Sequence, residues 1–233
     1  MKLVVEVASI DSLIVRLFDD IDESNMPWLI AATLRIREVF GDWLIDVVPS
    51  YTTVLIQYDI TEVGARKARE IIFEALDDLQ PIDQQQGRRL VVPVWYDLSV
   101  GPELKLVSHR IGKDIHQIIA LHSEREYCVF ALGFSPGYAY MGLLDELLST
   151  PRLSTPRKRV SAGSVAIAER QTTTYPQESP GGWNVLGRTP SNLFDRTLEG
   201  YSLLQPGDRV RFEPIGRSEF VSLGGDDTPL EAL

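Results

Sequence analysis

The chain after Tyr127 is divided into short apolar runs by closely spaced glycines and prolines. Glycine and proline at such intervals are typical of turns between strands. Frequent turns between short strands indicate a closed barrel or a sandwich rather than a sheet built from β-α-β units. The turn sequences are GFSPGY (133–138), STPRLSTPRKRVSAGS (149–164), ESPGGW (178–183) and LQPGD (204–208).

The first third of the chain has a different pattern, in which β-rich runs alternate with amphipathic helical segments. Strands are expected at 3–7, 13–18, 43–48 and 53–58, and helices at the apolar repeats that run from Leu29 to Phe40 and from Ala68 to Leu79. Asp22 or Ser24 can cap the first helix, Gly41 can end it, and Thr61 can cap the second. This β-β-α-β-β-α order predicts a sheet with helices on one face, a ferredoxin-like α+β unit.

A polar stretch separates the two patterns. Residues 80–89 (QPIDQQQGRR) have almost no apolar content and are expected to form a linker or an exposed loop. We therefore predict an N-terminal ferredoxin-like α/β domain at 1–83 and a β-barrel domain carrying the candidate site at 84–233. In the second domain, residues 90–96 should form a strand that Pro93 places at an edge or a bulge, and residues 114–121 should form a helix.

Charge and composition exclude several classes of function. The formal net charge is −10, which disfavours nucleic acid and anionic lipid as partners. No apolar run approaches the ~20 residues of a membrane-spanning helix, and Glu6 and Asp11 interrupt what would be the core of a signal peptide. One cysteine cannot form an intramolecular disulfide, which fits a reducing compartment, so a cytoplasmic location is expected.

The turn GFSPGY is the first of three segments that could carry chemistry. Pro136 fixes φ at one turn position, and Gly137 can take a positive φ at the next. Such a stiff turn would hold Phe134 and Tyr138 in fixed directions, so these four residues are candidates for ligand binding. The alternative is a tight corner whose aromatic residues belong to the core, which the local sequence favours.

The second segment, residues 147–168, contains no acidic residue although the chain as a whole is acidic. It includes Arg157, followed by Gly163 and Ser164. Backbone N–H groups at a glycine turn can converge on an anion, and arginine supplies a bidentate fork. The alternative is a solvated basic loop that balances nearby carboxylates or docks on an acidic partner, and the sequence supports both equally.

The third segment carries adjacent glycines, Gly181 and Gly182, before Trp183. The glycines allow a ligand to approach the backbone, and Trp183 provides a flat apolar wall. A plain hairpin turn is the alternative for a glycine pair. Three constrained turns so close in sequence favour the rim of a pocket, to which Gln171, Tyr175 and Arg188 could also contribute.

His122 ends the predicted helix at 114–121 and could act as a general base near neutral pH. A structural histidine at a helix C-terminus is the favoured alternative. Cys128 lies in an apolar strand and is expected to be a buried, inert thiol. Three dispersed histidines and one cysteine show no metal-ligand spacing, so no metal site is predicted, and the chain has neither a phosphate loop nor a nucleophile elbow.

Long motifs along nearly the whole chain carry a family resemblance. They are VPSYTTVLIQYD (48–59), VVPVWYDLSVGPEL (91–104), LHSEREYCVFALGFSPGYAYMGLL (121–144), TPRLSTPRKRVSAGSVAIAERQTTTYPQESPGGWNVLGRTP (150–190) and LLQPGDRVRF (203–212). With these motifs the chain resembles the family that contains the B-type subunit of 5-oxoprolinase, the sporulation kinase inhibitor KipI, and subunit 1 of allophanate hydrolase or urea carboxylase carboxyltransferase units.

The resemblance implies an N-terminal α/β domain followed by a cyclophilin-like β-barrel. It also implies a C-type partner subunit with a related barrel and an A-type subunit that completes an ATP-dependent 5-oxoprolinase. That enzyme opens the lactam of 5-oxoproline to glutamate, with ATP and Mg²⁺ at a site that a partner subunit can share. Phosphorylation of the lactam oxygen needs positive charge and backbone donors in a site that excludes water. The resemblance would give these roles to Arg157 with Gly163 and Ser164, and to the Gly181-Gly182 turn. It would make His122 the residue that transfers protons.

Other functions fit the same motifs. One is a KipI-like inhibitor that binds a sensor histidine kinase and performs no chemistry. Another is an allophanate hydrolase or urea carboxylase-type subunit 1. A prolyl isomerase is suggested by the barrel alone, which is only a fold analogy.

Overall fold

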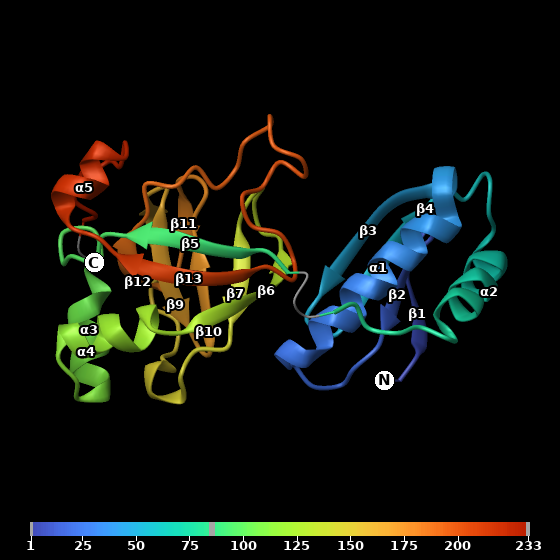
Figure 1. The fold of residues 1–233 in the computed structure, drawn as a ribbon, viewed down its shortest axis with the longest axis horizontal. Helices are drawn as coiled ribbons and strands as arrows, with labels where there is room; N and C mark the ends of the chain where they lie inside the picture. Colours follow the sequence, from blue (N-terminus) through green and yellow to red (C-terminus); the bar gives the residue numbers. More distant parts are fainter. Residues whose placement is uncertain (1, 84–86, 232–233) are drawn as a thin grey trace. The chain divides into compact units, whose positions relative to one another are not determined.

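The computed structural model describes residues 2–83 and 87–231. Contacts within the chain divide it into two compact units, Met1–Gly87 and Arg88–Leu233 (Figure 1). The boundary predicted at residue 84 falls on residues 84–86, which lie outside the described residues. None of the helices in the described residues has the length and apolar character needed to cross a membrane.

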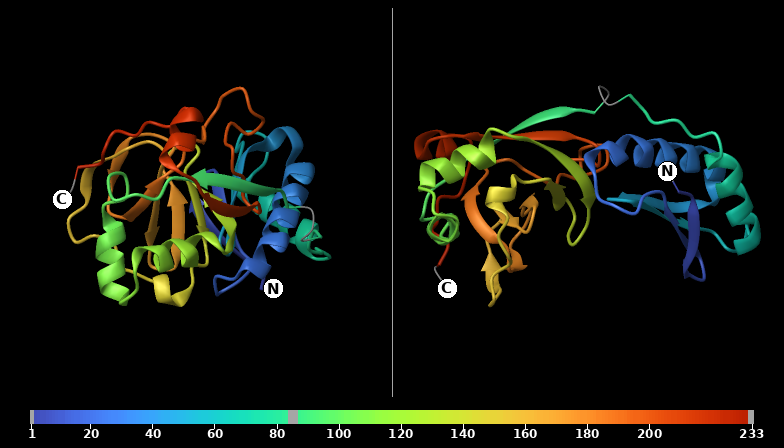
Figure 2. Two further views of the ribbon diagram at one scale, coloured as in Figure 1. Left: turned by 60° about the vertical axis from the view of Figure 1, so that its left-hand side comes forward. Right: turned by 90° about the horizontal axis from the view of Figure 1, so that it is seen from below.

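The N-terminal unit has the predicted β-β-α-β-β-α order. Its elements are β1 (Val4–Ser9), β2 (Ser12–Arg16), α1 (Met26–Phe40), β3 (Leu44–Ser50), β4 (Thr53–Tyr58) and α2 (Ala65–Leu76), with 3-10 turns at Glu23–Asn25 and Gly41–Trp43. The four strands pair antiparallel in the order β1-β2-β4-β3. The helix α1 lies along one face of this sheet (Figures 1 and 2).

The ends of the two helices follow from local chemistry. Pro27 stands in the first turn of α1, where its missing N–H costs nothing, and Gly41 ends the helix at a φ of 50°. The prediction for the start of the second helix was wrong. Thr61 donates its hydroxyl and its amide N–H to Asp59 in a short turn, and α2 begins only at Ala65.

The C-terminal unit is built on one curled sheet of seven strands (Figure 1). Its elements are β5 (Arg89–Val94), α3 (Glu103–Ile111), α4 (Ile115–Ser123), β6 (Glu126–Leu132), β7 (Ala139–Gly142), β8 (Arg157–Val160), β9 (Ser164–Ala168), β10 (Gln171–Thr174), β11 (Ser179–Gly181), β12 (Asn184–Arg188), β13 (Arg209–Pro214) and α5 (Arg217–Ser222), with a 3-10 turn at Glu146–Leu148. The sheet order is β12-β9-β10-β7-β6-β13-β5, and β11 pairs separately with β8. Pro93 lies in β5 at the edge of this sheet, as predicted, whereas α3 was not predicted.

The two edge strands of the curled sheet meet at one residue pair. The backbone N–H of Trp95, just after β5, donates to the Arg188 carbonyl at 2.9 Å, and the N–H of Arg188 donates back at 3.0 Å. Glycine at position 187 permits this approach, because a Cβ there would lie 2.7 Å from the Trp95 carbonyl oxygen. The expected closed barrel is thus a curled sheet whose edges are joined by a single bridge among the described residues.

Alternate residues of the sheet face two separate apolar cores. Val165 and Ile167 of β9 belong to the first core, which includes residues of α3 and α4. Ala166 and Ala168 belong to the second, which we call the aromatic cluster because it is formed by Tyr138, Val160, Ala166, Ala168, Tyr175, Trp183 and Val185. The period of two along a strand therefore assigns the candidate residues of β9 and β10 to one side or the other, and on β12, where the register shifts between Val185 and Gly187, the pairing with β9 assigns them.

Candidate functional site

Three predicted site residues from distant segments meet in the aromatic cluster. The ring of Tyr138 lies edge-on to Tyr175 at a centroid distance of 5.2 Å and to Trp183 at 6.4 Å. Burial raises the pKa of Tyr138 and of Tyr175 above the ordinary value, so both phenols stay neutral. A Cβ on residue 181 would lie 2.4 Å from the Tyr175 hydroxyl, which explains the glycine at that position. These four residues, which come from three segments of the chain, therefore lie close together.

Arg157 faces the carboxylate of Glu103. It begins β8 and is 4% exposed, with its guanidinium paired to the buried carboxylate of Glu103 on α3. The second carboxylate oxygen of Glu103 accepts the Val185 N–H at 3.0 Å, and a further N–H of Arg157 donates to the Glu231 carbonyl. The charge of Arg157 is therefore neutralised by Glu103 in a contact that joins α3, β8 and β12, and its catalytic role stays a prediction.

His122 lies between Tyr96 and Thr172. It has no exposed surface, its Nδ1 lies 2.7 Å from the Tyr96 hydroxyl, and its Nε2 lies 2.8 Å from Thr172 Oγ1. Its ring stacks on Phe212 at 4.7 Å. Burial lowers the pKa of His122 to about 3, so the ring is neutral and cannot exchange a proton with a substrate in this conformation. These contacts are the ones expected of a structural histidine, and proton transfer by His122 stays a prediction.

The turn GFSPGY lies beside a different hollow. Phe134, Pro136 and Gly137 line a cavity of about 430 Å³ together with Phe194 and Tyr201. The ring of Phe134 contacts Tyr138 at a centroid distance of 5.1 Å, which links the turn to the aromatic cluster. The four candidates of this turn therefore divide between an exposed hollow and a buried core.

The remaining candidates lie at the ends of strands. Arg188 ends β12 and is 1% exposed, and its cross-strand neighbour is Ser164 at the start of β9. Gly163 precedes Ser164 at a φ of 78°, and a Cβ there would lie 2.4 Å from the Thr189 carbonyl. Gly182 follows β11, and its carbonyl accepts the Leu153 N–H at 2.7 Å. Gln171 begins β10, at the opposite end of that strand from Thr174.

Sequence reasoning missed a segment that covers the aromatic cluster. We call residues Gly224–Glu231 the C-terminal segment. Its Leu230 packs against the cluster, and the Leu230 N–H donates to the Ser99 carbonyl at 2.8 Å. The sequence signal was faint: two aspartates, Asp226 and Asp227, stand in a chain whose predicted site is basic.

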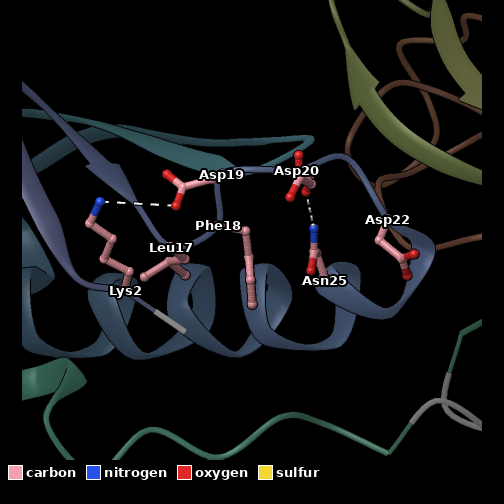
Figure 3. A pocket seen from close by; sticks show the side chains of 7 residues that line it. All are labelled: Lys2, Leu17, Phe18, Asp19, Asp20, Asp22 and Asn25. Atoms are coloured by element: carbon pink, nitrogen blue, oxygen red, sulfur yellow. Dashed lines mark hydrogen bonds and ion pairs between the residues drawn. The ribbon is translucent and has the colours of Figure 1, made fainter.

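A second hollow lies in the N-terminal unit (Figure 3). It measures about 340 Å³ and is lined by Lys2, Leu17, Phe18, Asp19, Asp20, Asp22 and Asn25. Lys2 Nζ lies 3.9 Å from the Asp19 carboxylate, and Asn25 donates to the Asp20 carbonyl at 2.8 Å. None of the predicted site residues lies here, and residues 2–83 and 87–231 contain no group of three acidic, histidine or cysteine side chains that could hold a metal ion.

The fold and site define a mixed α/β protein with a curled sheet that bears an aromatic cluster beside two buried arginines. The family model for the carboxyltransferase domain, subdomain C and D, matches residues 3–204. The chain belongs to this family.

Curated relatives carry one name. The chain is 32% identical over 220 residues to the B-type subunit of 5-oxoprolinase from Bacillus subtilis (strain 168), an alignment that covers 90% of this chain and 91% of that protein. It is 44% identical over 142 residues to the B-type subunit of 5-oxoprolinase from Escherichia coli O157:H7, covering 61% of this chain and 63% of the relative. The second alignment thus spans less than two thirds of the Escherichia coli protein.

Solved structures agree on the fold. The crystal structure of TTHA0988 has a TM-score of 0.77 at 33% identity and covers 88% of this chain, which spans 40% of that longer chain. The urea carboxylase of Kluyveromyces lactis has a TM-score of 0.75 at 15% identity and covers 97% of this chain and 23% of the other. At that identity the likeness shows the fold alone.

Proposed function

We propose that this chain is the B-type subunit of an ATP-dependent 5-oxoprolinase, which opens 5-oxo-L-proline to L-glutamate. The observation that carries the proposal is the alignment with the Bacillus subtilis 5-oxoprolinase protein, because it runs through 90% of this chain and 91% of that relative. The urea carboxylase likeness is one of fold only and favours no second function.

We propose a binding role for this chain. A lactam carbonyl is a poor electrophile, and transfer of a phosphoryl group from ATP to its oxygen makes it reactive toward water. Positive charge and fixed donors stabilise such a transfer. Because His122 and Arg157 are buried and paired, we propose that the C-type and A-type subunits supply the proton transfer. Mg²⁺ would be held by the phosphates of ATP and by those partners, since the described residues offer no acidic cluster for it.

The architecture supports finer assignments within the proposal. A ferredoxin-like unit has the order β-α-β-β-α-β. Joining its last strand in front of its first gives β-β-α-β-β-α and the antiparallel order β1-β2-β4-β3 observed here, so we propose a circularly permuted ferredoxin-like unit. We propose a cyclophilin-like barrel for the curled sheet of the C-terminal unit, and a cytoplasmic location, which a chain with one cysteine suits.

The test is reconstitution. This chain is co-purified with C-type and A-type subunits from the same organism, and glutamate release from 5-oxoproline is measured with and without ATP. We expect ATP-dependent release by the complete assembly and none when this chain is left out. Urea serves as a control substrate. Absence of glutamate release from a stable, complete assembly would reject the proposed function.

A further inference from the structure

Arg188 carries a buried guanidinium group, and the edge formed by its Nε and Nη2 makes no hydrogen bond to the described residues. Its Nη1 donates to the carbonyls of Asp226 at 2.6 Å and Thr228 at 2.8 Å. Its Nε and Nη2 are buried and find no hydrogen-bond partner among the described residues. The side chain is 1% exposed, and burying such donors unpaired is costly, more so on a charged group.

The unused edge is the one with which arginine holds an oxyanion. Elsewhere in this chain, Arg159 donates through Nε and Nη2 to both oxygens of Glu178, at 2.9 and 2.8 Å. Arg88 donates to both carboxylate oxygens of Asp208 through the same two nitrogens. At Arg188 the nearest carboxylate is Asp226, 4.0 Å away from Nη1 and with 72% of its side chain exposed. The parallel N–H pair of Arg188 therefore has the shape that matches a carboxylate or phosphate and no such group in place.

Ser164 adds a third donor at the same spot. It is directly opposite Arg188 in the β9–β12 pairing, so the two side chains leave the sheet on one side. Ser164 is fully buried, and its hydroxyl also has no partner among the residues that the structure describes. Two side chains that are neighbours across strands thus present three unsatisfied hydrogen-bonding groups.

The C-terminal segment covers this spot with few attachments of its own. At its start the Gly224 and Gly225 N–H groups donate to carbonyls of α5, and Asp227 pairs with Arg217 of that helix. Farther along, the segment is held by the two Arg188 contacts, by the Leu230 N–H to Ser99, and by the Glu231 carbonyl at Arg157. The carbonyl groups carry only partial charge, and the one paired carboxylate, that of Asp226, lies on the Nη1 side at 4.0 Å. A hollow of about 520 Å³ lies beside the segment, lined in part by Thr228 and Pro229. A segment with so few contacts can open locally without unfolding the sheet beneath it.

We propose that Arg188 and Ser164 form an oxyanion subsite, which takes the carboxylate or phosphate group of a small molecule when the C-terminal segment lifts. The subsite deepens the proposed function and rests on it, because 5-oxoproline carries a carboxylate and ATP carries phosphates. The segment competes with the ligand, since the Asp226 and Thr228 carbonyls occupy Nη1 of Arg188. Ligand affinity is therefore reduced by the fraction of molecules in which the segment is closed.

The experiment loosens the segment and measures anion binding by the full chain. Calorimetric titrations use inorganic phosphate and 5-oxoproline as separate probes, in a chloride buffer. Leu230→Ser removes the apolar anchor, and Leu223→Ser is the matched control, because Leu223 is 53% exposed and lies outside the aromatic cluster. We expect the Leu230→Ser variant to bind a probe about tenfold more tightly than the wild type or the control, which corresponds to about 1.4 kcal/mol.

A second substitution in the loosened variant identifies the subsite. Arg188→Lys keeps the charge but loses the fork, and we expect binding to weaken by at least about tenfold. If this variant does not fold, Ser164→Ala replaces it and should weaken binding several-fold. Tighter binding of phosphate alone assigns the subsite to a phosphate, and tighter binding of 5-oxoproline alone assigns it to a carboxylate.

Two results would overturn the subsite. One is equal affinity of the Leu230→Ser and Leu223→Ser variants for both probes. The other is binding that survives both Arg188→Lys and Ser164→Ala. Neither depends on turnover, so an assembly that releases glutamate while this chain shows no such anion binding would reject the subsite and leave the proposed function standing.

Discussion

The buried pair of Arg157 and Glu103 makes the strongest prediction about stability. Both side chains are about 95% buried, at 4% and 5% exposed, and Glu103 also accepts the Val185 N–H. Glu103→Gln preserves the shape of the side chain but leaves the positive charge of Arg157 uncompensated. Arg157→Met leaves the negative charge of Glu103 uncompensated. Breaking one partner of a buried pair typically costs about 3–5 kcal/mol, whereas replacing both is often close to neutral. We therefore expect each single variant to lose about 3 kcal/mol and the double variant to lose less than either.

Urea unfolding followed by tryptophan fluorescence measures these losses. Trp28 and Trp43 belong to the N-terminal unit, so the series is built on Trp28→Phe and Trp43→Phe, which leaves Trp95 and Trp183 to report on the C-terminal unit. With a urea dependence of about 2 kcal/mol per molar, a loss of 3 kcal/mol moves the midpoint by about 1.5 M. A double variant that loses the sum of the two single losses would show that the pair is uncoupled and refute the reasoning.

Three further predictions follow from single residues. Burial lowers the pKa of His122 to about 3, so below pH 6.5 the unfolded chain binds a proton at this residue and the folded protein does not. The free energy of unfolding should therefore fall by about 1.4 kcal/mol per pH unit below pH 6.5. The urea midpoints at pH 7 and pH 5 should differ less in the His122→Asn variant than in the wild type. Glu169 has a φ of 51° between β9 and β10, so Glu169→Gly should raise the thermal midpoint, with a gain of about 0.5–1 kcal/mol; an unchanged or lower midpoint would contradict this. Gly163→Ala should cost more than about 1 kcal/mol in urea unfolding, because its Cβ would meet the Thr189 carbonyl, and a neutral effect would count against that contact.

The sequence predicted those features of the fold that depend on residues close together in the chain. Gly41 at the end of α1 and Pro93 in an edge strand are each signalled by residues within one element. The β-β-α-β-β-α order follows because each of its elements can be recognised separately. The start of α2 was missed because the Asp59–Thr61 turn used the residue that looked like a cap. The helix α3 was missed although Gly112, at a φ of 67°, gives an ordinary signal for its end.

The candidate site was harder to predict because its partners are distant in sequence. Arg157 looked free to bind an anion, but its counter-ion is Glu103, which lies 54 positions away. His122 looked like a general base, but Tyr96 and Thr172 occupy its two nitrogens from 26 and 50 positions away. No local pattern encodes such pairs. The same local signal, a basic side chain beside a glycine, also marked Arg188, and there the structure leaves two donors of one edge unpaired among the described residues.

The alternation of the strands decides which of the sequence candidates can act together. Thr172 points to the core that holds His122, whereas the hydroxyl of its neighbour Thr173 hydrogen bonds with Tyr138 on the other side. Ser164 shares the side of Ala166 and Tyr138 by the alternation along β9, and Arg188 joins that side as the cross-strand partner of Ser164, after the register shift between Val185 and Gly187. His122 is therefore separated from the proposed subsite by the thickness of the sheet, and no rotation of its side chain can bring it there. Any acid or base that works on a ligand at Arg188 must come from the face covered by the C-terminal segment, which is the face left for a partner subunit when that segment lifts.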